Sequence, residues 1–263
     1  MPSDPRAIES LLGFWAEAGV DAIVLDTPVD RLTERPRAAP QRIAPVAAKP
    51  QSPVAPDVSG AIAEARKAAA DAGDLEALAA AIAAFDGCGL KREGARQAVF
   101  SRGAADAPVM LIGEAPGAEE DAQGAPFVGR AGKLLDRMLA AAGLEGRVFI
   151  TNTVFWRPPG NRNPTPQEQL VCAPFLERAI TLVRPKLLVL AGGAAAKALL
   201  HRPEGILALR GRWFDWTSGD GTLALPALPT LHPAFLLRQP AAKKRAWADL
   251  MLLAERLDRA ERS

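Results

Sequence analysis

The stretch Val109-Met-Leu-Ile-Gly-Glu-Ala-Pro-Gly-Ala-Glu-Glu-Asp121 decides the fold of this chain. It opens with a short apolar run, which predicts a strand buried on both faces. Gly113 ends the strand, and the turn-forming residues after it swing the backbone sharply, so that Glu114 is presented and not buried. A parallel strand delivers its carboxyl end to a crevice, and we therefore expect Glu114 to face a binding site.

An apolar loop, Pro126-Phe-Val-Gly-Arg-Ala-Gly132, follows three further acids, Glu119, Glu120 and Asp121. The glycines and proline around Phe127 place this aromatic residue on a loop, where we expect it to be exposed. Leucine and methionine residues at helical spacing then predict a helix over 131–142. Together, the acids, the aromatic residue and the helix indicate a loop that binds a ligand.

Further apolar runs complete the predicted architecture. We expect buried strands over 148–154, 186–191 and 228–231, helices over 166–183, 194–200 and 242–257, an edge strand over 98–100, and an antiparallel pair over 213–216 and 222–225. Buried strands that alternate with helices form parallel sheets covered on both faces. The sequence therefore predicts an α/β fold, a three-layer α/β/α domain around a mainly parallel, four-stranded sheet.

Each predicted central strand ends in a residue or pair that can carry chemistry: Glu114, Asn152, Gly192-Gly193 and His232. Each also has an ordinary structural explanation, since Asn often forms turns and the glycine pair matches no phosphate-binding pattern. In an open parallel sheet, however, the carboxyl ends of the strands meet in one crevice. This convergence is the main reason to expect one site.

Composition sets the class of protein and its organisation. The chain has 263 residues, 49% hydrophobic and 24% charged, as in globular proteins, and a net charge of only +2, so nucleic-acid binding requires a local basic patch. No run is long enough to span a bilayer, the start lacks a signal peptide, and two cysteines indicate a reducing, cytoplasmic setting. We expect a helical segment (1–27), a flexible linker with seven prolines (28–58), a helix that Gly73 can divide (59–84) and the main domain (85–263).

Four motifs in this order carry a family resemblance: Gly-Glu-Ala-Pro-Gly-x-x-Glu-Asp, Pro-Phe-Val-Gly-x-Ala-Gly, Thr-Asn-x-x-x-x-Arg-Pro-Pro-x-Asn-Arg and Leu-His-Pro-Ala. From about residue 85 to residue 253 the chain resembles the family-4 uracil-DNA glycosylases of bacteria and archaea. The resemblance implies a uracil-DNA glycosylase-like fold. It also implies an enzyme that flips a deoxyuridine out of DNA and hydrolyses the bond between uracil and sugar, the first step of base excision repair.

The resemblance assigns roles around the base. It implies that Phe127 stacks on uracil and that Asn152 reads its edge, with Ala115 and Gly117 of the first motif beside them. Glu120 matches the residue that excludes the methyl group of thymine. A tyrosine does this in the best-known glycosylase family, which the absence of tyrosine from this chain rules out. The catalytic set would be Glu114 near the sugar and the water, His232 as donor to uracil O2, and Asn152.

The resemblance also implies a DNA-binding surface for single- or double-stranded DNA. Backbone groups and side chains of two loops would meet phosphates, a wedge would enter the duplex, and a basic helix start would hold the flanking strand. These residues are Arg157, Asn161, Arg162, Gly192 and Gly193 for the loops, Leu236, Leu237 and Arg238 for the wedge, and Lys243, Lys244 and Arg245 for the helix. No membrane partner is implied, and a monomer is expected.

The chain departs from the family at its iron–sulfur cluster. Relatives hold a 4Fe-4S cluster with four cysteines, and the matching positions here are Phe85, Cys88, Trp156 and Cys172. Because two thiolates cannot replace four, we predict a protein without the cluster, without a bound metal and without another cofactor.

Two other functions stay open at this point. One is a glycosylase for another deaminated base, such as hypoxanthine or xanthine. The other is a protein that holds uracil or abasic sites without turnover. The matches at Asn152 and Glu120 favour uracil over another base, and intact Glu114, Asn152 and His232 favour an enzyme over a binding protein.

Overall fold

The centre of the computed structural model is one sheet with the strand order β1-β3-β2-β4-β6-β5. The structure describes residues 58–262. Strands β3, β2, β4 and β6 are parallel neighbours, while β1 and β5 pair antiparallel at the two edges. The strands are β1 (Ser101–Arg102), β2 (Val109–Gly113), β3 (Val148–Asn152), β4 (Leu187–Ala191), β5 (Phe214–Thr217) and β6 (Ala224–Thr230). The expected parallel core of four strands is present, but the sheet has six strands and not four.

The edge strands and the last strand differ from the sequence-based expectation. β1 begins at Ser101, after the predicted edge strand over 98–100, where the Val99 N–H donates to the Phe155 carbonyl at 2.7 Å. The strands predicted over 222–225 and 228–231 are one strand, β6, in the structure. Its two prolines, Pro226 and Pro229, resemble strand breaks in the sequence, but β6 nevertheless pairs with β4 on one side and β5 on the other.

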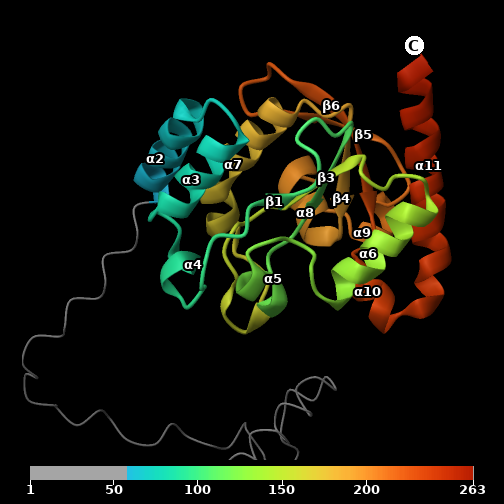
Figure 1. Cartoon of the computed structure of the whole chain (residues 1–263), viewed down its shortest axis with the longest axis horizontal. Coiled ribbons are helices and arrows are strands. Elements are labelled where there is room, and N and C mark those ends of the chain that lie inside the picture. The colour runs from blue at the N-terminus through green and yellow to red at the C-terminus, as the bar shows by residue number, and fades with distance from the viewer. Residues whose placement is uncertain (1–57, 263) are drawn as a thin grey trace, which may run out of the picture. The chain divides into compact units, whose positions relative to one another are not determined.

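Helices cover the sheet on both faces (Figure 1), which confirms the three-layer architecture. One face packs on α2, α3, α7 and α8 through Met110 and Ile112, whereas α6 and α11 cover the opposite face over Val109 and Leu111. The alternation along β2 follows from the two-residue period of a strand. The helices are α2 (Val58–Asp71), α3 (Leu75–Ala84), α4 (Gly89–Arg92), α5 (Ala118–Gln123), α6 (Arg130–Ala141), α7 (Pro166–Val183), α8 (Gly193–Leu200), α9 (Ile206–Leu209), α10 (Pro233–Arg238) and α11 (Lys243–Arg262), with short 3₁₀ turns η1 (Pro159–Asn161) and η2 (Pro240–Ala242).

Helix α7 shows how local signals set an element. The Thr165 side chain accepts a hydrogen bond from the Glu168 N–H at 3.2 Å, and the Glu168 carboxylate accepts from the Thr165 N–H at 2.7 Å. This reciprocal cap and a proline at the first helical position fix the start of the helix. The predicted range 166–183 is therefore confirmed.

The helices before residue 85 belong to the same hydrophobic core as the sheet. α2 and α3 are separate helices, with the break at Gly73 that the sequence predicted. Leu78 and Ile82 of α3 are buried in one cluster with Phe175 of α7. The predicted segments 1–27 and 28–58 lie outside the described residues, except that Val58 already begins α2. Within the described part of the chain, no helix is both long and apolar enough to cross a membrane.

Candidate active site

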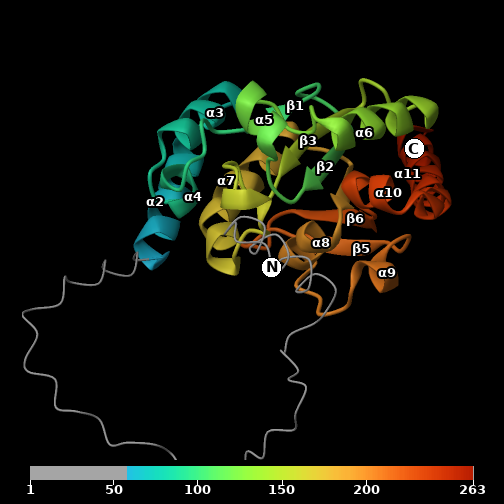
Figure 2. The same cartoon turned by 90° about the horizontal axis from the view of Figure 1, so that it is seen from below.

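The carboxyl ends of the parallel strands open onto one cavity of about 800 Å³. Glu114 follows β2, Asn152 ends β3, Gly192 and Gly193 follow β4, and His232 follows β6; all five line this cavity. Figure 2 looks onto this end of the sheet, with α5, α6, α8 and α10 around it. The convergence expected from the sequence is confirmed, and its cause is the parallel order of the four strands.

Several other predicted residues share the cavity with them. Ala115, Gly117, Glu120 and Phe127 line it from the loops after β2, and Asn161, Arg162 and Arg238 line its mouth. Phe235, at the start of the stretch that resembles the wedge, lines it too, and so do Ile206 and Leu207 of α9, which the sequence did not single out. Ile206 and Leu207 belong to a short helix without a motif of its own, so no sequence signal marks α9 as part of the site.

Glu114 presents an unsatisfied carboxylate to the cavity. Its Oε1 atom is buried and has no hydrogen-bond partner among the described residues. Burial raises the pKa of this carboxyl above its ordinary value, because a charge loses hydration there. The Thr153 hydroxyl donates to the Glu114 main-chain carbonyl at 2.6 Å and so holds the turn. The result is a carboxylate that is a stronger base than a solvated one and is free to bind a ligand.

Asn152 presents the second unsatisfied acceptor. The residue is 1% exposed, and its Oδ1 atom has no hydrogen-bond partner within residues 58–262. Gly113, its partner in the register of β2 and β3, makes room for it: a Cβ added at Gly113 would lie 2.4 Å from Asn152 Oδ1 and 2.6 Å from the Phe127 ring. Buried polar atoms are rarely left unpaired, so this atom indicates a ligand that donates a hydrogen bond.

Phe127 lies on a loop, as predicted, but its ring forms the cavity wall and is only 6% exposed, contrary to the expectation of an exposed ring. Its φ of 55° is in the left-handed region, which is unusual for an aromatic residue and typical of functional sites. Arg102 holds the loop by donating to the carbonyls of Pro126 at 2.8 Å and Phe127 at 3.2 Å. Gly132 is required for the close approach of α6, because an added Cβ would lie 1.6 Å from the Phe127 carbonyl oxygen. The aromatic ring is thus fixed before any ligand arrives.

His232 is a neutral imidazole with a defined tautomer. Burial and, next, the positive charge of Arg238 lower its pKa to about 4. Its Nδ1 atom accepts a hydrogen bond from the Ala234 N–H at 3.1 Å as it caps α10, so the proton resides on Nε2. The ring centroid is 5.5 Å from that of Phe127. His232 therefore offers a neutral N–H donor beside the aromatic wall.

Glu120 joins the two loops that follow β2. Its carboxylate accepts from the Gly117 N–H at 3.1 Å and from the Gly129 N–H at 2.9 Å. Neighbouring Asp121 is buried and accepts from the Arg96 N–H at 2.8 Å. Glu120 and Asp121 of the acid cluster therefore fix the cavity wall through hydrogen bonds. Glu120 both lines the cavity and holds the two loops together.

Most of the predicted DNA-binding residues lie on three segments: the loop over 157–162, helix α10 and the start of α11. Arg157 donates to Asn161 at 2.7 Å, and Arg162 pairs with Glu168 at 2.7 Å and Glu93 at 3.1 Å, which raises the Arg162 pKa further above its usual range. Leu236 is fully buried against α6 and cannot enter DNA in this structure, whereas Leu237 beside it is 37% exposed. Lys243, Lys244 and Arg245 are exposed at the start of α11, outside the cavity.

Comparison with known proteins identifies the class. The sequence profile of the uracil DNA glycosylase superfamily matches residues 100–251. The match spans more than half of the chain and contains the four strand ends of the site, and the protein belongs to the uracil-DNA glycosylase superfamily.

Within this superfamily the chain is similar to type-4 uracil-DNA glycosylases. The enzyme of Pyrobaculum aerophilum is 38% identical over 192 residues, which cover 71% of this chain and 96% of that protein. The enzyme of Thermotoga maritima is 39% identical over 149 residues (56% and 75%), and that of Saccharolobus solfataricus is 39% identical over 168 residues (62% and 77%). The resemblance read from the four motifs is confirmed.

The residues at the expected cluster positions do not fit an iron–sulfur cluster. Phe85, Trp156 and their neighbours Phe155 and Phe175 form one buried aromatic group, with the Phe85 and Phe175 centroids 5.1 Å apart. Cys88 and Cys172 are buried free thiols. Interaction between the two thiols lowers the pKa of Cys88 and, with burial, raises that of Cys172. Nor does any group of three or more His, Cys, Asp or Glu within residues 58–262 provide a metal site.

Proposed function

We propose that this protein is a uracil-DNA glycosylase that hydrolyses the bond between uracil N1 and the sugar C1′ after the nucleotide is flipped out of DNA. One observation carries this proposal: two buried acceptors without partners, Glu114 Oε1 and Asn152 Oδ1, share one cavity with the neutral His232. Uracil offers hydrogen-bonding partners to Asn152 and His232, and the water that attacks the sugar offers one to Glu114. The type-4 relatives support the same substrate.

Recognition of the base follows from the cavity walls. The fixed ring of Phe127 provides a stacking surface, and stacking of a base on an aromatic side chain is worth about 1–3 kcal/mol. Uracil N3–H can donate to the unpaired Asn152 Oδ1, while the amide Nδ2 donates to O4. Cytosine presents an acceptor and a donor at these two positions, so it would leave the buried amide mismatched. Glu120 lines the same cavity and, we infer, lies where the methyl group of thymine would fall.

The chemical step uses His232 and Glu114. As the N1–C1′ bond breaks, its electron pair passes to the base and negative charge develops on O2. The Nε2–H of His232 donates to this oxygen, and a donor aimed at developing charge is among the largest catalytic terms. A water oxygen bonds to C1′, and Glu114, whose pKa is raised by burial, takes the proton released from that water. The products are uracil, once its anion takes a proton from solvent, and an abasic site.

The DNA path is inferred from the surface around the cavity. We infer that phosphates meet the start of α8 at Gly193 and the loop from Arg157 to Arg162. The Gly192 N–H already donates to the Thr230 carbonyl at 2.9 Å, so Gly192 contributes its close backbone approach and not a donor. The exposed Leu237 on α10 is the side chain that would occupy the space left by the flipped base, with Arg238 beside it. Lys243, Lys244 and Arg245 would hold the flanking strand.

We infer that this glycosylase works without a cluster, as a monomer in the cytoplasm, on single- or double-stranded DNA. The support for a cluster-free enzyme is the pair of buried aromatic side chains, Phe85 and Trp156, at two of the four ligand positions. Iron content and the visible absorption of the purified protein test this, because a 4Fe-4S cluster absorbs and carries iron whether or not the enzyme turns over.

The proposal is tested by uracil release from oligonucleotides that carry one uracil, in a single strand or opposite guanine or adenine, beside matched strands with hypoxanthine. We expect release from the uracil strands and a loss of at least about 100-fold for Asn152→Ala. Gln123→Ala, which truncates an exposed amide at the end of α5 outside the cavity, is the matched control and should keep wild-type activity. Release of hypoxanthine alone would identify another deaminated base as the substrate. Tight binding without release would identify a protein that holds lesions.

A further inference from the structure

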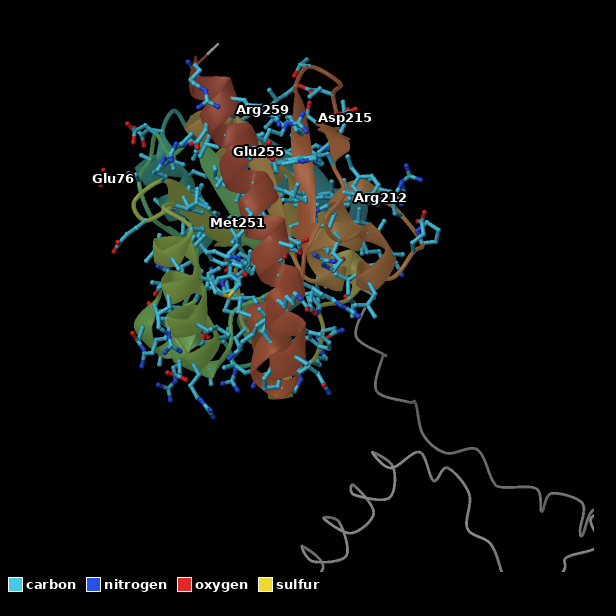
Figure 3. The ribbon with its side chains drawn as sticks, turned by 90° about the vertical axis from the view of Figure 1, so that its right-hand side faces the viewer. Glu76, Arg212, Asp215, Met251, Glu255 and Arg259 are labelled. Atoms are coloured by element: carbon cyan, nitrogen blue, oxygen red, sulfur yellow. The ribbon has the colours of Figure 1, made fainter. Side chains whose placement is uncertain are left out.

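A second hollow, of about 280 Å³, lies on the surface between α6 and α11. Met138 of α6 and Lys243, Lys244 and Trp247 of α11 line it. Figure 3 shows the two helices side by side. The function proposed above uses Lys243 and Lys244 as phosphate contacts, but it gives no role to the hollow itself or to Trp247.

Trp247 is unusually accessible for its size and type. It is 41% exposed, and Met251, one turn farther along the same face of α11, is 37% exposed. A tryptophan usually buries most of its ring, and an exposed aromatic and methionine surface that adjoins a hollow is typical of a binding site. The indole is thus available to stack on a planar ligand.

The charge around the hollow selects an anionic ligand. Lys243 and Lys244 form part of its wall, and α6 carries Arg130, Lys133 and Arg137 on its exposed surface. In the described part of the chain, none of these five cations has a carboxylate within ion-pair distance. An aromatic surface among unpaired cations is the combination that binds single-stranded nucleic acid, in which bases stack and phosphates pair with lysine and arginine.

The hollow is continuous with the catalytic face through a short piece of chain. Helix α10 begins after His232 and ends at Arg238, both of which line the catalytic cavity, and the turn η2 then leads directly into Lys243. Helix α6 makes the same connection, since Ala131 near its start lines the cavity and Met138 lines the hollow. Ala131 and Met138 are seven residues apart on α6, or about 10 Å, so one DNA strand can reach both the cavity and the hollow.

We propose that this hollow is a second nucleotide-binding site, in which an unpaired base of single-stranded DNA flanking the target stacks on Trp247. The adjacent phosphates pair with Lys243 and Lys244. The site favours single strands, because a base inside a duplex cannot leave its neighbours to meet the indole. This inference rests on the proposed function only for the presence of DNA in the cavity. It predicts that the enzyme holds single-stranded flanks more tightly than its catalytic site alone would.

The test is the affinity of the full-length protein for uracil-free oligothymidylates of increasing length and for a blunt duplex, followed by fluorescence anisotropy. We expect Trp247→Ala to weaken binding of the longer single strands about tenfold, or about 1.4 kcal/mol, and to leave duplex binding unchanged. Trp247→Phe should restore most of this affinity, because phenylalanine also stacks. Leu252→Ala truncates a residue of similar exposure (38%) on another face of α11 and should change nothing.

Salt dependence separates stacking from charge. Lys243→Ala with Lys244→Ala should reduce the slope of log affinity against log salt by about 1.4 for single strands, while Trp247→Ala leaves the slope intact. Equal single-strand affinity in Trp247→Ala and wild type would overturn the proposal, as would the same loss in Leu252→Ala. A protein partner that binds at the hollow, while Trp247→Ala leaves the affinity for DNA unaltered, would also overturn it. Because these strands contain no uracil, the binding test and the uracil-release test are independent. A negative binding result does not contradict uracil release, and a protein that releases no uracil can still be tested for binding.

Discussion

Replacing His232 tests the proposed arrangement most directly. Its imidazole has one observed and one proposed role, which substitutions can separate. Nδ1 caps α10 through the Ala234 N–H, and we propose that Nε2–H donates to uracil O2. His232→Asn keeps an acceptor that is favoured at helix starts but is too short to replace the Nε2 donor. His232→Ala removes both roles and should lose about 1 kcal/mol of stability in addition.

The size of the catalytic effect follows from the loss of one donor to a developing oxyanion. Such a donor is worth about 2.7–4 kcal/mol, so both variants should lower kcat about 100- to 1000-fold. KM should change little, because uracil O2 carries its charge only after the N1–C1′ bond begins to break. The assay is single-turnover release of uracil from a labelled oligonucleotide. His201→Asn, at the exposed cap of α8 where φ is 52°, is the matched control and should behave as wild type.

The pH dependence is the second part of this prediction. With a pKa of about 4, roughly one imidazole in a thousand is protonated at pH 7, so His232 acts as a neutral donor. The plot of turnover rate against pH should therefore show no limb, that is, no change of slope, near pH 6.5 that depends on His232. Because the folded pKa lies below the ordinary value, the wild type should lose stability as the pH falls from about 6.5 to 4, and His232→Asn should lose less. A limb near pH 6.5 that disappears in His232→Asn would show that the imidazolium is the working form, and a loss below tenfold would refute the donor role.

Two other substitutions test the cavity walls. Gly113→Ala should abolish uracil binding and cost about 1–3 kcal/mol in denaturant unfolding, because the added methyl group meets both Asn152 and the Phe127 ring; unchanged binding would contradict the close packing. Glu114→Gln should nearly abolish uracil release. It should also raise the thermal midpoint at neutral pH, because a carboxyl whose folded pKa is raised destabilises the fold increasingly as the pH rises from its ordinary pKa to the raised one. This gain should vanish below the ordinary pKa of 4.5, and a lower midpoint at neutral pH would contradict the buried charge.

The central layer of the fold could be predicted because its signals are local. The runs at 109–112 and 187–191 are apolar at every position, and only parallel strands covered on both faces bury them fully. The start of α7 follows from the reciprocal cap of Thr165 and Glu168, which are three residues apart. Once four such strands are neighbours, their carboxyl ends must meet, so Glu114, Asn152 and His232 could be placed in one site without coordinates.

The rest depends on contacts that are distant in the sequence. The edge strands are short: β1 has no apolar residue and β5 is only partly apolar, so their neighbours in the sheet induce them. Phe127 looks exposed because its flanking residues form a loop, but Arg102 of β1 folds that loop over the cavity. The site contribution of α9 has no local signal either, since Leu207 is an exposed leucine whose place at the cavity only the tertiary fold defines.

The aromatic group around Phe85 explains how the fold is held where relatives of this type bind a cluster. A cluster would connect the end of α3, the loop after β3 and α7, because its ligand positions lie at residues 85, 88, 156 and 172. Here the Phe85 ring contacts both Trp156 and Phe175 and so joins the same three segments. A large aromatic side chain in a closed core is worth about 3–5 kcal/mol against alanine, so two of them supply a connection of substantial strength. The cluster positions lie among the core residues on one face of the sheet, and none of them lines the catalytic cavity, so replacing thiolates by rings leaves the donors and acceptors of the site unchanged.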